Sequence, residues 1–62
     1  MSNLEEKKIL DILEKLSDAM YSIHDANLCL RLLNFDNIIN FQSKLNEAFS
    51  TCDEIYNFLD EL

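Results

Sequence analysis

The sequence contains no glycine and no proline in 62 residues. These two residues build most tight turns, and glycine also builds the loops that hold phosphate groups. Their absence excludes the Gly-rich nucleotide-binding motifs and makes β-hairpin turns hard to form. Helix interiors need neither residue, so an all-α fold is expected. The hydrophobic fraction of 48% is that of a folded chain rather than a disordered one.

Long apolar runs and positive charge are also scarce. No stretch approaches the roughly 20 apolar residues of a membrane span. The first residues, 1–8, are charged and lead into no uninterrupted apolar stretch, so no signal peptide is predicted. A cytoplasmic location with reduced thiols is therefore expected. The formal net charge of −7 argues against direct binding to nucleic acid or to an anionic membrane.

The short chain makes a single domain at most, covering residues 1–62. Chains of this size usually need disulfides, a metal ion or a partner chain to be stable. The two cysteines, Cys29 and Cys52, fit neither a C-x-x-C motif nor zinc-ligand spacing. A protein partner, either a second copy or another chain, is therefore expected to complete the fold.

Two stretches carry apolar residues at the three- and four-residue steps of an amphipathic helix. Ser2 and Glu5 form an S-x-x-E capping box that would start the first helix. Its apolar stripe consists of Ile9, Leu13, Leu16, Met20, Ile23 and Leu30, with Asn27 in the remaining slot and with Ile12, Ala19, Ala26 and Leu33 beside it. The second stripe consists of Ile38, Phe41, Leu45, Ala48, Cys52, Ile55, Leu59 and Leu62.

The two stripes are out of phase between Asn34 and Asn37, a cluster of turn-forming and N-cap residues. The sequence therefore predicts an antiparallel two-helix hairpin with helices at about 3–34 and 37–62. Either Asn34 or Asp36 would cap the second helix. Two such hairpins are expected to dimerise into a four-helix bundle.

The hairpin predicts which residues face each other. In an antiparallel pair the position numbers of facing residues have a constant sum, and here the sums are 71 or 72, from Leu33–Ile38 at the turn to Ile9–Leu62 at the open end. In this register large residues face small ones in the middle layers, as interdigitating side chains prefer. The two cysteines then lie several helical turns apart, too far for an internal disulfide.

The only histidine, His24, has no nucleophile or second metal ligand one helical turn away. No inward-facing E-x-x-H pair of a di-metal helix bundle is present. The sequence therefore predicts no catalytic residue, no metal ligand and no bound cofactor, and it favours a protein that is not an enzyme.

Asn27 is the one polar residue within the first stripe. We call the line of contact between the two helices the seam. At a seam position a single asparagine can fix the register and number of helices by pairing across the interface, at some cost in stability. The alternative is that Asn27 lies at the edge of the stripe and is hydrated.

A second apolar stripe lies on the back of the first helix and continues over the turn. A single hairpin cannot bury apolar side chains on that side of the helix, and contiguous exposed apolar surface usually marks a contact site. Either a second copy or a different protein could cover it. We refer to these residues as the back stripe: Leu10, Tyr21, Leu28, Leu32, Phe35 and Ile39.

Acidic residues are concentrated in the second helix. Residues 36–62 hold six acids and one lysine, Lys44, which accounts for −5 of the net charge of −7. The acidic surface consists of Glu47, Asp53, Glu54, Asp60 and Glu61. It could attract a basic partner or serve only to keep the chain soluble.

These features favour a small adaptor or regulator that acts through helical packing, as a homodimer. Two alternatives are compatible with the same features. One is an acidic inhibitor that mimics nucleic acid charge and blocks a basic groove. The other is a helical-hairpin chaperone that shields the amphipathic helix of another protein.

Overall fold

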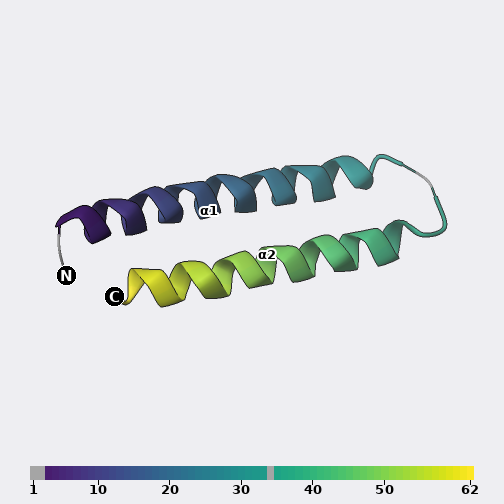
Figure 1. Cartoon of the computed structure of the whole chain (residues 1–62). Coiled ribbons are helices and arrows are strands. Elements are labelled where there is room, and N and C mark those ends of the chain that lie inside the picture. Colours follow the sequence, from purple (N-terminus) through teal and green to yellow (C-terminus); the bar gives the residue numbers. More distant parts are fainter. Residues whose placement is uncertain (1–2, 34) are drawn as a thin grey trace.

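The computed structural model describes residues 3–33 and 35–62. Its elements are two helices, α1 (Asn3–Leu30) and α2 (Ile38–Asp60), which pack against each other. The helices run antiparallel, so that α2 ends beside the start of α1 (Figure 1). The hairpin is a rod with extents of 50 × 15 × 10 Å. This arrangement confirms the predicted all-α hairpin.

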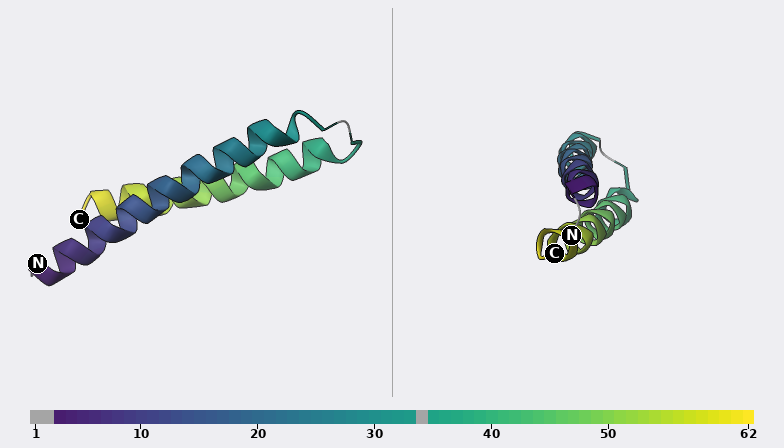
Figure 2. Two further views of the ribbon diagram at one scale, coloured as in Figure 1. Left: turned by 90° about the horizontal axis from the view of Figure 1, so that it is seen from above. Right: turned by 60° about the vertical axis from the view of Figure 1, so that its left-hand side comes forward.

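The helices cross at a shallow angle rather than lying strictly parallel (Figure 2). This geometry lets the side chains of one helix fit between those of the other along most of the contact. Within the described residues, neither helix is apolar enough over a sufficient length to cross a membrane.

The first helix ends earlier than predicted, at Leu30 rather than near residue 34. Beyond it the backbone tightens into three successive i→i+3 hydrogen bonds, the last of them from the Leu33 amide to the Leu30 carbonyl at 3.0 Å. Such tightening satisfies carbonyl groups that have no partner at a helix C-terminus. The connection between the helices is therefore longer than the Asn34–Asn37 turn that the sequence suggested.

The second helix starts after Asn37, which occupies the N-cap position without a side-chain hydrogen bond. The prediction that Asp36 caps this helix was wrong, and Asn34 lies outside the described residues, as does Ser2 of the predicted capping box. Backbone groups contribute instead, because the Phe35 carbonyl accepts from the Ile38 amide at 3.2 Å. The connection thus enters α2 through a turn rather than through a side-chain cap.

The contact between the helices leaves little of the chain inaccessible to water. Ile38 is the one buried residue among those described, and it is 9% exposed. All seven seam residues predicted for α1, Asn27 included, are half-buried. The described residues therefore form the seam of a hairpin but no closed hydrophobic core.

The seam of α2 is rotated relative to the prediction. Leu45, Cys52 and Leu59 are half-buried as expected, together with Gln42 and Tyr56. The predicted seam residues left largely exposed are Phe41, Ala48, Ile55 and Leu62. The apolar residues of α2 form a stripe that is wider than the contact with α1. Only one edge of this stripe can face α1, and in the structure it is the edge next to Gln42 and Tyr56.

Candidate interaction surfaces

The exposed side of the seam carries two apolar rows that we call the front face. The row of α1 is Ile12, Ala19 and Ala26, continued by Leu33 in the connection beyond the helix. The row of α2 is Phe41, Ala48 and Ile55, continued by Leu62 just past the end of the helix. Each row repeats every seven residues, which keeps its members on one side of a helix that follows a shallow crossing. In an antiparallel hairpin both rows lie on the same side of the seam. Ala19 is half-buried and the other seven residues are exposed.

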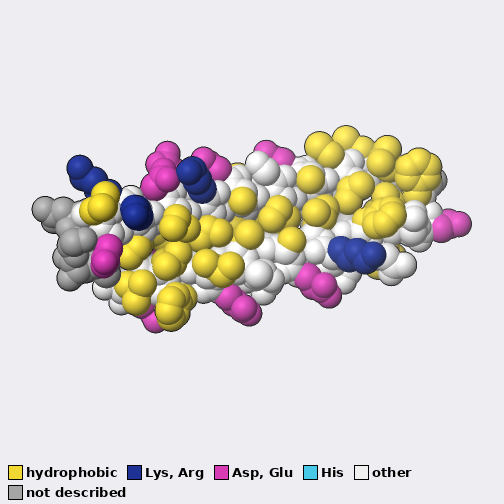
Figure 3. All heavy atoms as spheres, viewed as in Figure 1, with side chains coloured by type: hydrophobic (Ala, Val, Ile, Leu, Met, Phe, Trp, Pro, Cys, Tyr) yellow, Lys and Arg dark blue, Asp and Glu magenta, His cyan; other side chains and the backbone are white. Residues whose placement is uncertain are grey.

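Figure 3 shows the front of the hairpin as a space-filling surface. Hydrophobic side chains form a band along the junction of the two helices, and charged side chains lie toward its edges. By helical spacing, Lys8, Lys15 and Lys44 border the two rows. An apolar strip with a charged rim is the usual layout of a surface that packs against another helix pair.

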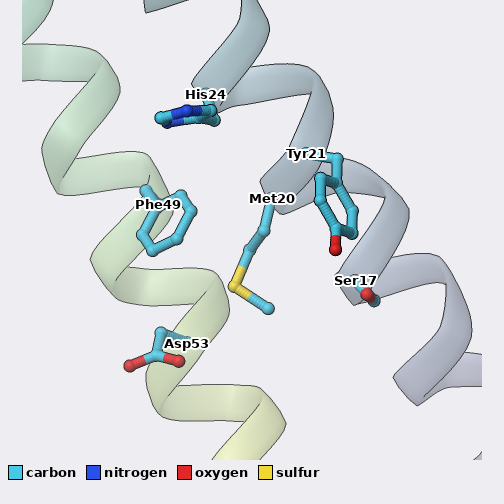
Figure 4. A pocket seen from close by; sticks show the side chains of 6 residues that line it. All are labelled: Ser17, Met20, Tyr21, His24, Phe49 and Asp53. Carbon is cyan, nitrogen blue, oxygen red and sulfur yellow. The ribbon is translucent and has the colours of Figure 1, made fainter.

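The opposite side of the seam carries an open groove that includes His24. Met20 and His24 project from α1 toward Phe49 and Asp53 of α2 (Figure 4). Ser17 and Tyr21 complete the lining. A histidine and one carboxylate do not make a metal site, and no group of three metal-ligating side chains occurs within the described part of the chain.

The back stripe is exposed at every position, from Leu10 to Ile39. Its most exposed member is Leu32, at 86%, which lies beyond the end of α1 in the connection. The stripe therefore remains an apolar surface that the hairpin itself does not cover.

Asn27 forms a cross-helix contact inside the hairpin. Its Nδ2 donates to Oδ1 of Asn46 in α2 at 2.9 Å. Its own Oδ1 is buried without a hydrogen-bond partner among the described residues. A buried carbonyl oxygen without a donor costs about 1–3 kcal/mol, so Asn27 links the helices at the expense of stability.

Replacing Asn27 with leucine is expected to raise the free energy of unfolding by about 1–2 kcal/mol. The leucine removes the unpartnered oxygen and adds apolar contact to the seam, while Asn46, which is exposed, can bond to water. Urea titration followed by circular dichroism measures the change. Asn27→Ala is the control, because it removes the same oxygen without filling the seam. A less stable leucine variant would show that the Asn27–Asn46 bond outweighs the unpartnered oxygen.

The five residues of the acidic surface are all exposed. None of them pairs with a lysine or arginine within the described residues; the ion pair in the first helix joins Lys15 to Asp11 at 3.0 Å. The last turn of α2 has no basic residue to offset its acids. Both cysteines are free thiols, with Cys29 exposed and Cys52 half-buried.

Comparison with known proteins returned no relative: no family model, no curated protein and no solved structure matches this chain.

The front face is the surface that sequence reasoning missed. Its residues were all recognised as apolar, but they were assigned to the contact within the hairpin. The width of the second apolar stripe could have indicated this surface. The stripe of α2 contains two neighbouring rows that each repeat every seven residues, and together these rows are wider than the contact with one partner helix. A helix with two such rows has room for a second neighbour.

Proposed function

We propose that this chain is a small non-enzymatic interaction module, an adaptor or regulator, that acts by packing its helices against those of a partner chain. A bundle of four helices is the simplest assembly of this kind, since it covers the side of each helix that a hairpin leaves open.

The observation that carries the proposal is the near absence of a closed core. The chain is 48% hydrophobic, yet Ile38 is the one buried residue among those described. Short chains without disulfides or metal ions seldom bury enough apolar surface to offset the entropy of folding. Association supplies the missing burial, and it would do so through the surfaces left open on this hairpin.

Light scattering of the purified chain tests the proposal. We expect the chain to be helical only in samples in which the measured particle mass exceeds the mass of one chain, or after a partner is added. A stable, helical single chain of 7.3 kDa would contradict the proposal.

The unpaired acidic surface supports a second candidate, an inhibitor that occupies a basic groove in place of nucleic acid. The dependence of binding affinity on ionic strength separates the two candidate functions. Binding through exposed carboxylates weakens steeply between low and moderate salt, because ions screen separated charges over about 10 Å at 0.1 M. Binding through apolar helix faces changes little over the same range.

A further inference from the structure

We infer that the front face is covered by a second copy of this chain, with the two hairpins side by side and both connections at the same end of a four-helix bundle. The inference rests on the proposed function and adds the identity of the partner, the surface and the orientation.

The exposed area of the hairpin matches what such a dimer needs. The chain exposes 5092 Å², whereas a compact monomer of 7.3 kDa exposes about 4200 Å². The excess of about 900 Å² is close to the roughly 800 Å² that each partner contributes to a stable protein interface.

The composition of the front face suits contact with an identical face. Its two rows contain apolar residues at all eight positions, and both have alanine in their middle layers. Alanines let helices approach closely, while the larger residues at the two ends fill the space between them. A face that is apolar along both helices can pack on itself, which a two-fold dimer requires.

The charges at the rim favour one orientation of the two copies. With both connections at the same end, α1 of one copy lies beside α2 of the other. Positions of α1 and α2 that face each other within one hairpin then also lie at the same level along the bundle axis in the two different copies. Each lysine of the rim then has an acid of the second copy within about one helical turn of its own height, offset by two to three residues because the position numbers of each pair sum to 69 rather than 71 or 72. The pairs are Lys8 with Glu61, Lys15 with Glu54, and Lys44 with Asp25. Charged pairs at such flanking positions determine partner orientation in helical bundles.

These pairs cannot form within one hairpin. Lys15 lies on the outer margin of α1 and Glu54 on the outer margin of α2, so the front face separates them. In the single chain Lys15 pairs with Asp11 instead, and both side chains are well exposed. That pair lies at the surface and leaves Lys15 able to reach a second carboxylate.

The opposite orientation loses part of this complementarity. With the connections at opposite ends, α1 lies against α1 of the other copy. Lys8 would then face residues 28–33 of the second copy, which carry only the positive charge of Arg31. The rim therefore favours the arrangement with both connections at the same end.

A spin label in the connection measures the orientation. The label is attached through Asp36→Cys, an exposed position, in a chain whose native cysteines are replaced by Cys29→Ser and Cys52→Ala. Connections at the same end predict a label-to-label distance less than half of the 50 Å length of the hairpin. A distance near that full length would overturn the inference.

A charge exchange between Lys15 and Glu54 tests the same point with both cysteines intact. Lys15→Glu and Glu54→Lys are each expected to raise the dissociation constant of the dimer about tenfold, because each dimer contains two such pairs and loses both. The variant with both changes is expected to return to within about twofold of the parent chain. Absence of recovery in the double variant would overturn the inference.

The matched control exchanges Lys7 and Asp53, which alter the chain charge identically but lie off the front face. Lys7→Glu and Asp53→Lys, alone or together, are expected to leave the dissociation constant within about threefold. Changes as large as those at Lys15 and Glu54 would overturn the inference, since net charge rather than facing pairs would then control association.

The outcomes distinguish this inference from the proposed function. A dimer with distant connections overturns the orientation and leaves the interaction module intact. A chain that stays monomeric and unfolded at every concentration overturns the choice of a second copy and indicates a foreign helix on the front face. A folded monomer overturns both.

Discussion

Replacing Phe41 and Ile55 with aspartate is expected to turn the assembled helical protein into unfolded single chains. These side chains are 42% and 44% exposed in the hairpin and lie on the front face, where a second copy would cover them. Burying the still exposed part of each of these side chains stabilises the dimer by about 1 kcal/mol, and a dimer contains four such side chains, two from each copy. The dissociation constant should therefore rise about a thousandfold or more, as measured by sedimentation equilibrium.

The back stripe offers a matched control. Leu10→Asp with Tyr21→Asp also removes two large side chains and adds two negative charges, but on the other side of α1. This variant is expected to keep its mass and helical content. If the control pair dissociates the protein and the front-face pair does not, the self-association surface lies on the back stripe, and the front face has a different role.

Truncating Ile38 to alanine is expected to lower the free energy of unfolding by about 2–3 kcal/mol. Ile38 is the one buried residue among those described, at the point where the connection enters α2. Its loss leaves a cavity beside a helix start that has no side-chain cap, so little nearby can compensate. Urea titration at a fixed protein concentration measures the change.

The neighbouring Ile39 is the control for this prediction. Ile39→Ala is the same chemical change one residue further on, at a side chain that is 77% exposed. Its effect should stay within about 0.5 kcal/mol. Equal losses at both positions would mean that Ile38 acts through helix propensity rather than through burial.

The sequence was sufficient to predict the hairpin because the periodicity of its apolar residues is regular and its turn residues are clustered. The seam of α1 was predicted residue by residue, and within it Asn27 donates a hydrogen bond to Asn46 of α2. Helix ends were less predictable. Leu33 continues the apolar pattern past Leu30, but the backbone has already tightened there, which periodicity alone does not reveal.

The rotation of α2 could not be predicted from periodicity. Phe41 and Gln42 are adjacent, and a hydrophobic pattern favours the phenylalanine for the seam, yet Gln42 is half-buried while Phe41 is exposed. Burying the Gln42 side of α2 is compatible with the Asn27–Asn46 bond, since Asn46 lies one turn away on the same side. This choice leaves Phe41, Ala48, Ile55 and Leu62 exposed, and we propose that a partner covers them.

We propose that one hairpin is incomplete alone and that association with a partner completes its fold. Dilution tests this most directly, with far-ultraviolet circular dichroism and sedimentation equilibrium carried out on the same samples. Helical signal and mass should fall together as the chain is diluted below its dissociation constant. A helical signal that persists unchanged in samples containing only single chains would show that the hairpin is stable without a partner.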